Sequence, residues 1–363
     1  MKLTKRLFAA AIATVMVLGF AGCHKKNEIA VTVGDVEFTS AYYMAAFLDA
    51  DYAAKVEISE NLTEEEQQDA NLDFYSKKID GKKYANWVKD TAIENLKKIA
   101  AYKILCKENG VELKDDVVAN AEANATFYYQ YGYTPNGAQV NFADNGVSEA
   151  TYTKYFTDSN YNSAYFDFLY AKDGKEEIAA KDVKTKIYDS FVIADVLDAT
   201  FEENATDEDK EALEKKLKGY LKNLKNGKKT FEEVYNAYNN ITEEEEHDHG
   251  DEAHPKDELA SVIGGEDTSY NKEYYETVKK MKKGEAKLIE LEDGTGFALV
   301  VKQDIKADKY YLDELDSEAR HLIKDEDYEK LIDDYVKTLK ADVSKYAIGQ
   351  FKVKKIAAVE TAQ

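Results

Sequence analysis

The sequence predicts an α+β fold in which helices dominate and strands are concentrated in the second half of the chain. Only two prolines occur in 363 residues, and proline is the residue that most strongly interrupts helices. The clearest helical pattern covers residues 84–110, where apolar side chains recur at helical spacing until Asn109 and Gly110. The clearest strand patterns are the runs rich in β-branched residues at 191–200 and 297–302.

The first half of the chain begins with a short strand pair. Residues 29–33 and 36–38 are strand-like and flank Gly34 and Asp35, a combination typical of a β-hairpin. Helices are expected next, and they cover about 40–52, 84–110, 114–131, 148–170 and 175–190.

In the second half, strand patterns alternate with helix patterns. After the strand at 191–200 comes a helix ended by Gly227, and then Thr230 and Glu233 form a capping box that opens a short helix. The remaining expected elements are a helix at 271–285, strands at 286–291 and 297–302, a long helix at 312–346 and a final strand at 351–356. The order β-α-α-loop-α-β-β predicts a separate α+β unit.

The first 22 residues have the layout of an export signal. Three cations precede an apolar stretch that is short for a membrane span. It ends in Phe20, Ala21 and Gly22, and the match to a bacterial lipobox predicts cleavage before Cys23 and lipidation of that residue. Lipid chains would hold the protein on the extracytoplasmic face of the cell membrane. The alternative is an ordinary signal peptide with an incidental cysteine.

Charge and motifs restrict the partners. The formal charge of −22 argues against nucleic acid or anionic lipid as the main partner. The other cysteine, Cys106, lies among helix-forming residues and is expected to be a buried free thiol. No P-loop, dinucleotide-binding fingerprint, serine triad or cysteine-based zinc motif occurs, so no cofactor is expected.

Three stretches together resemble the SurA/PrsA-like extracytoplasmic foldases. They are the hairpin IAVTVGDVEFTSAYY, the helix KKTFEEVYNAYN at 228–239 and the stretch YYETVKKMKKGEAKLIELEDGTGFALVVK at 274–302. In that family a helical chaperone domain precedes a parvulin (rotamase) domain, and a C-terminal helix returns to the first domain. The resemblance implies a mainly helical chaperone domain at 23–190, an inserted parvulin-like α+β domain at 191–305 and a returning C-terminal segment at 306–363.

The resemblance also places the catalytic positions. Parvulins carry one histidine on the first strand and another on the last, and these positions fall on Asp195 and Ala298, so both histidines are replaced. Prolyl isomerisation needs no acid–base step, and a pocket that binds the twisted bond can lower its barrier of ~20 kcal/mol. We expect the two strands to form a groove that includes Phe297 and binds extended peptide with weak or no isomerase activity.

Aromatic residues are concentrated between positions 127 and 170, where there are 14 in 44 residues. Tyr128, Tyr129, Tyr131 and Tyr133 crowd one stretch. One interpretation is a peptide-binding cradle, because tyrosine offers amphipathic contact area at low entropic cost. The other is helix packing with the phenol groups reaching water. We expect both to apply, with packing taking the larger share.

The acidic segment 243–258 contains His247, His249 and His254. Imidazole and carboxylate ligands suit Zn²⁺ or Cu²⁺, so the segment is a candidate metal site. His247 and His249 cannot share one helical face, although an extended segment would allow it. The alternative is a solvated acidic loop.

Three functions are open at this stage. The first is a membrane-anchored foldase or chaperone that binds unfolded or nascent exported proteins. The second is an active peptidyl-prolyl isomerase that uses other polar groups, such as Asp195 with Tyr235 or Tyr238. The third is a metal- or solute-binding lipoprotein in which the histidine-bearing loop is the site.

Overall fold

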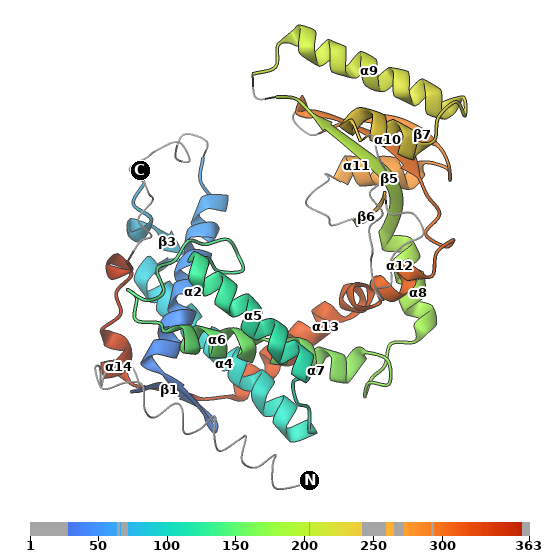
Figure 1. Cartoon of the computed structure of the whole chain (residues 1–363). Coiled ribbons are helices and arrows are strands. Elements are labelled where there is room, and N and C mark those ends of the chain that lie inside the picture. Colours follow the sequence, from blue (N-terminus) through green and yellow to red (C-terminus); the bar gives the residue numbers. More distant parts are fainter. Residues whose placement is uncertain are drawn as a thin grey trace. The chain divides into compact units, whose positions relative to one another are not determined.

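The chain folds as two compact units, each described here by itself (Figure 1). The computed structural model describes residues 28–63, 66, 72–202, 204–241, 259–264, 272–291 and 294–357. The first unit combines the residues up to Leu169 with those from Glu326 onward, and the second is Tyr170–Asp325. The chain therefore leaves the first unit, builds the second and returns to the first.

The sheet of the first unit joins the two ends of the chain. Its three strands are β1 (Ile29–Val33), β2 (Val36–Thr39) and β9 (Ala341–Val343), in the antiparallel order β2-β1-β9. Val31 of the central strand is paired with Phe38 on one side and Val343 on the other. The predicted hairpin is confirmed, whereas β9 lies inside a segment predicted to be helical.

Helices make up most of the first unit. They are α2 (Ser40–Glu60), α4 (Tyr84–Asn109), α5 (Asp115–Tyr131), α6 (Glu149–Ser159) and α7 (Tyr161–Tyr170), with the short hairpin β3 (Lys78–Ile79) and β4 (Lys82–Lys83) and the 3₁₀ helix η1 (Phe74–Ser76) between α2 and α4. Thr39 caps α2 by accepting a hydrogen bond from the backbone N–H of Tyr42. Phe47 and Ala50 of α2 are fully buried, so this helix forms the centre of the unit's core.

The predicted helix at 148–170 is two helices. The side-chain amide of Asn160 donates to the carbonyl oxygen of Phe156 at 3.0 Å, which ends α6 one turn after that residue. The chain then restarts as α7. The predicted helix at 175–190 begins later than expected, as α8 (Ala180–Ser190) of the second unit.

The long C-terminal helix predicted at 312–346 is wrong in its extent. The observed elements are α12 (Tyr310–Glu314), α13 (Asp316–Thr338), β9 and α14 (Lys345–Gly349). The predicted strand at 351–356 is also wrong, because the chain there forms the 3₁₀ helix η3 (Val353–Lys355). Val343 pairs with β1, and the ring of Phe351 lies 5.6 Å from that of Tyr43. Contacts with distant parts of the chain thus override the local pattern.

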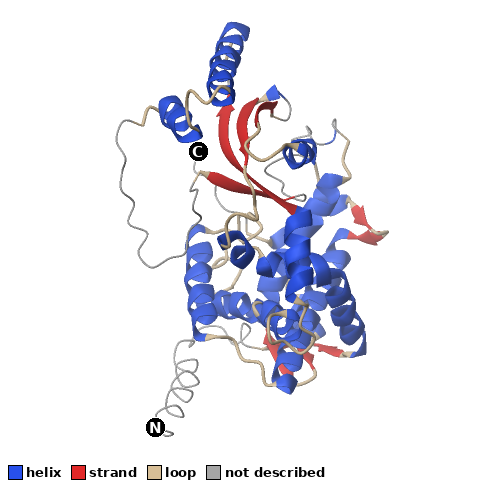
Figure 2. Ribbon diagram, turned by 90° about the vertical axis from the view of Figure 1, so that its right-hand side faces the viewer, coloured by secondary structure: helices blue, strands red, loops and turns tan. Residues whose placement is uncertain are grey.

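The second unit is built on a four-stranded antiparallel sheet (Figure 2). Its strands are β5 (Phe191–Thr200), β6 (Ala260–Gly264), β7 (Ala286–Glu290) and β8 (Gly296–Lys302), in the order β6-β5-β8-β7. The predicted strands are confirmed, and β5 and β8 are neighbours as expected. Strand β6 was not predicted, because its five small or apolar residues carry too little pattern.

Helices cover both faces of this sheet. They are α9 (Asp207–Lys225), α10 (Phe231–Asn239) and α11 (Lys272–Lys280). Val278 of α11 packs with Ala194 and Val300 on one face, whereas Leu217 of α9 and Leu299 belong to the cluster on the other. The α+β fold class is confirmed. Within the described ranges, no helix is both long and apolar enough to cross a bilayer.

Candidate peptide-binding surface

Large aromatic side chains are exposed where α5 ends. Phe127 is 55% exposed, Tyr131 64% and Tyr133 38%. Phe127 and Tyr131 are one helical turn apart, and their ring centroids lie 4.7 Å from each other. These three residues are called the α5 aromatic patch below. The sequence indicated the two tyrosines, but Phe127 was missed as a site residue because nothing local distinguishes an outward ring from an inward one.

The end of α5 is fixed by a glycine. Gly132 has φ of 67° and donates its backbone N–H toward the last turn of the helix. A Cβ there would lie 3.0 Å from the carbonyl oxygen of Val140, so another residue would strain both its own backbone and the returning loop. The side-chain amide of Gln139 in that loop donates to the hydroxyl of Tyr133 at 2.8 Å. The patch is therefore held in one place by backbone geometry.

The other two predicted tyrosines point into the core. The Tyr129 ring stacks on Phe142 at 5.4 Å, and its hydroxyl donates to the carbonyl oxygen of Val147 at 3.1 Å. The Tyr128 ring lies 5.7 Å from Phe156 of α6. The four tyrosines are thus divided, with Tyr128 and Tyr129 anchoring α5 and with Tyr131 and Tyr133 exposed.

Buried polar groups anchor α6 beneath α5. Asp158, only 6% exposed, accepts hydrogen bonds from Tyr42, Lys103 and Lys154 at 3.0, 2.6 and 2.8 Å. Burial lowers the pKa of Lys103 and raises the pKa of Tyr42. Tyr42 therefore remains a donor at neutral pH, and the network joins three helices.

A second carboxylate of the same framework has an unusual pKa. The hydroxyl of Tyr155 in α6 donates to Asp49 of α2 at 2.5 Å. Burial raises the pKa of Asp49 to about 6, and the hydrogen bond from Tyr155 opposes that rise only in part. The helix framework under the α5 aromatic patch therefore contains a group that titrates just below neutral pH.

Asp195 and Ala298, the two positions that the resemblance aligned with the parvulin histidines, are not neighbours. The register pairs Asp195 with Val301 and Ala298 with Asp198, and neighbouring residues of a strand point to opposite faces. Ala298 belongs to the cluster under α11, whereas Leu197, on the same side as Asp195, belongs to the cluster under α9 and α10. The expected groove with both positions in its wall is wrong, because the strands are neighbours but these side chains are on opposite faces.

Asp195 is part of the core. It is 3% exposed, and its carboxylate accepts a hydrogen bond from the side chain of Gln303 at 2.6 Å. Phe297 is partly buried, with its ring edge-on to Phe201 at 5.8 Å. Phe201 and Tyr238 line a hollow of about 690 Å³ at the end of β5. The aromatic residues of this region thus remain near a cavity, although Asp195 does not open onto it.

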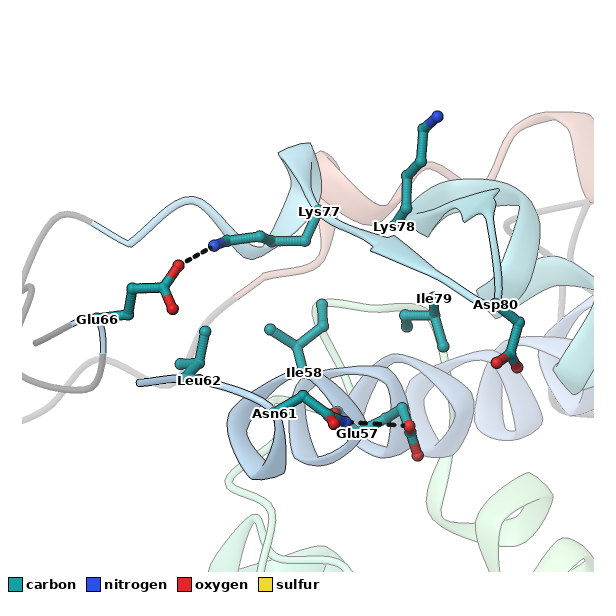
Figure 3. A pocket seen from close by; sticks show the side chains of 9 residues that line it. All are labelled: Glu57, Ile58, Asn61, Leu62, Glu66, Lys77, Lys78, Ile79 and Asp80. Carbon is teal, nitrogen blue, oxygen red and sulfur yellow. Dashed lines mark hydrogen bonds and ion pairs between the residues drawn. The ribbon is translucent and has the colours of Figure 1, made fainter. Parts of the chain in front are cut away.

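A smaller hollow lies in the first unit between the end of α2 and β3 (Figure 3). It measures about 370 Å³, and Ile58, Leu62 and Ile79 contribute apolar side chains to a lining that is otherwise polar or charged. Glu66 and Lys77 form an ion pair of 2.8 Å at its rim. Its volume lies at the lower end of the range of small-molecule pockets, which is roughly 300–1,000 Å³.

The predicted lipidation and metal residues lie outside the described part of the chain. These are Cys23 and the histidines His247, His249 and His254. Within the described part, no group of three or more His, Cys, Asp or Glu side chains is arranged to hold a metal ion. Cys106 is a buried free thiol, as predicted, and burial raises its pKa to about 11.

Comparison with known proteins gives likeness of fold only. No protein-family model matches the chain, and no curated protein matches it. Among solved structures it is similar to the foldase protein PrsA from Lactococcus lactis, with 14% identity and a TM-score of 0.39 over 88% of this chain and 96% of that one. It is also similar to PrsA from Bacillus subtilis, with 16% identity and a TM-score of 0.29 over 76% and 87% of the two chains.

Proposed function

We propose that the protein is an extracytoplasmic foldase or chaperone that binds unfolded exported polypeptides at the α5 aromatic patch. The observation that carries the proposal is the exposed ring pair of Phe127 and Tyr131 on a helix whose other side is anchored in the core. A pair of rings one helical turn apart adds only about 0.2–0.5 kcal/mol to helix stability, and exposed apolar groups of this kind mark interaction sites. Unfolded chains offer the apolar side chains that would cover them.

The size of the patch suits weak and reversible binding. Burying one fully exposed large apolar side chain contributes about 1.5–3 kcal/mol. Because the three rings are 38–64% exposed, covering them contributes roughly 2–5 kcal/mol before the cost of association is subtracted. A client held this weakly leaves when it folds and withdraws its own apolar groups. The net charge of −22 favours basic clients and keeps copies of the protein apart.

Attachment to the membrane is part of the proposal. It is supported by the signal-like pattern of residues 1–22 and the lipobox-like position of Cys23. A Cys23→Ala variant should be found in the medium or periplasm instead of the membrane fraction, as measured by fractionation and mass spectrometry of the N-terminus. An unchanged membrane fraction would contradict lipid anchoring at this residue.

We also propose that residues 191–305 form a parvulin-like domain with weak or no isomerase activity, between a chaperone domain at 23–190 and the segment 306–363. The order of its helices and strands supports the parvulin-like assignment. The weak activity is supported by Ala298, which offers no polar side chain, and by Asp195, whose carboxylate is buried with Gln303. The activity that we expect is binding of unfolded polypeptides and not catalysis of their isomerisation.

Suppression of client aggregation tests the main proposal. The variant Phe127→Ala with Tyr131→Ala keeps helix-forming residues in α5, so folding should be retained. Affinity for a reduced, unfolded client should fall at least tenfold, which corresponds to a loss of about 1.4 kcal/mol or more. Tyr346→Ala is the matched control, because this tyrosine is 70% exposed at another place in the first unit. Equal suppression by all three proteins would overturn the proposal.

A further inference from the structure

Strand β6 is an edge strand of the sheet in the second unit. It reads Ala-Ser-Val-Ile-Gly, and on one side it has no partner strand among the residues that the structure describes. Every other described edge strand contains at least one charged residue: Glu37 in β2, Asp342 in β9, Lys78 in β3, Lys82 and Lys83 in β4, and Lys287 and Glu290 in β7. Charged residues on an edge strand prevent pairing with another chain. Strand β6 contains none, so no charge within the strand itself opposes pairing with an added strand.

A hollow of about 760 Å³ is lined in part by β6. Val262 and Gly264 of β6 belong to its lining, together with Phe191 at the start of β5. Leu315 and Leu322 add apolar surface from the segment that contains α12 and α13. The hollow therefore offers space for side chains of a strand that lies along β6.

The rim of the hollow decides which side chains fit. Asp189, Glu314 and Glu318 contribute three carboxylates. Two cations lie beside them, Lys186 in the lining and Lys279, whose ammonium donates to the backbone carbonyl oxygen of Asp189 at 2.7 Å. Glu314 and Glu318 are both exposed and reach the rim from neighbouring helices. A basic side chain next to an apolar one complements this rim, whereas an acidic side chain is repelled.

We propose that an extended, lysine- or arginine-containing segment of a client adds to the outer edge of β6 as a fifth strand and places apolar and basic side chains in the hollow. This site is separate from the α5 aromatic patch, and it rests on the proposed binding of unfolded chains. Backbone hydrogen bonds to β6 supply affinity, and the hollow supplies the preference for side chains.

Backbone-modified peptides provide the sharpest test. A fluorescent hexapeptide of alternating valine and lysine is titrated into the full chain that carries Phe127→Ala and Tyr131→Ala, so that only the second site is measured. N-methylation of one alternate set of peptide amides should weaken binding at least tenfold, and methylation of the other set should have little effect, because only one set faces β6. Equal effects of the two sets, or no effect of either, would overturn strand addition.

Charge variants test the hollow itself. Glu314→Gln with Glu318→Gln should weaken binding of the valine–lysine peptide three- to tenfold and reduce its dependence on salt. Glu208→Gln with Glu211→Gln is the control, since both residues are exposed on α9, and it should leave affinity unchanged. A valine–glutamate peptide should bind at least tenfold more weakly than the lysine peptide. If the glutamate peptide binds equally well, or if the double substitution at the rim leaves the affinity unchanged, the peptide does not bind in this hollow. The aggregation assay tests the α5 aromatic patch independently of this result.

Discussion

The two units bury polar groups in different ways. In the first unit, Asp158 and Asp49 are held by tyrosine and lysine donors from other helices, so charge and hydrogen bonding fix the helix positions. In the second unit, apolar clusters cover both faces of the sheet. Its buried polar groups include Asp195, which accepts from Gln303, and Arg320, a cation that keeps its charge and donates to Asp316 and to backbone carbonyl oxygens. We therefore expect the free energy of unfolding of the first unit to depend on pH, and that of the second unit to depend on side-chain volume at strand contacts.

The largest effect is expected from Gly296→Ala in β8. A Cβ at this position would overlap the carbonyl oxygen of Ala199 and lie 2.7 Å from the Cα of Thr200. These are backbone atoms of the paired strand β5, so the strands must separate. We expect the second unit to lose about 3 kcal/mol or more of its free energy of unfolding. Hydrogen exchange should show early opening of Tyr170–Asp325 only.

The control for this substitution is expected to change stability in the opposite direction. Gly219→Ala lies in α9, and its new Cβ would have no neighbouring atom within 4 Å. Replacing a helical glycine by alanine stabilises by about 1 kcal/mol. Simultaneous opening of both units in Gly296→Ala would contradict the separate response of the second unit.

Local signals predicted most elements, and distant contacts account for the failures. The helix at 84–110 and the strand at 191–200 have strong periodicity and clear ends, and both are confirmed. Strand β9 was missed because Ala341–Val343 becomes a strand only by pairing with β1, more than 300 residues earlier in the sequence. Strand β6 was missed because five small or apolar residues between polar segments carry too little pattern.

The second effect in size is expected from Asp49→Asn. The pKa of Asp49 is about 6 in the folded chain and near its ordinary value of 3.8 when unfolded. The folded state therefore binds more protons between about pH 4 and 6, so the free energy of unfolding falls as pH rises through this window and stays lower above it. At pH 7.5 the asparagine variant should be more stable by roughly 2–3 kcal/mol, and at pH 4 the two should be similar.

Denaturant unfolding of the first unit at several pH values measures this difference. Tyr155→Phe provides the complementary variant, because the hydrogen bond from Tyr155 lowers the pKa of Asp49. Loss of this hydrogen bond should raise the pKa of Asp49 further, so the decline in stability should extend to higher pH. Identical profiles of stability against pH for Asp49→Asn and the unsubstituted protein would show that Asp49 does not cause the pH dependence.

The candidate site was predictable in composition but not in orientation. The density of aromatic residues indicated a surface near Tyr131 and Tyr133, yet the choice between core and solvent depends on which residues α6 offers to α5. Asp195 and Ala298 were placed by motif matching, which fixes positions along a strand but does not test the pairing register. A register shift of a single residue reverses the face of every side chain, so strand neighbours do not guarantee a shared groove.

The smallest effect is expected from Asp195→Asn, and it separates structural from catalytic roles. The buried carboxylate accepts from Gln303 at 2.6 Å, and asparagine keeps an acceptor there, so we expect a loss of about 1 kcal/mol in the second unit. Asp195→Ala leaves the Gln303 amide without this acceptor and should cost about 1–3 kcal/mol. Neither variant should change the rate of prolyl isomerisation measured on a short peptide, because Asp195 and Ala298 are on opposite faces of the sheet. A clear catalysed rate that disappears in Asp195→Asn, with the fold retained, would show that a buried carboxylate in the second unit acts on substrate, and the contrast drawn between the two units would then fail.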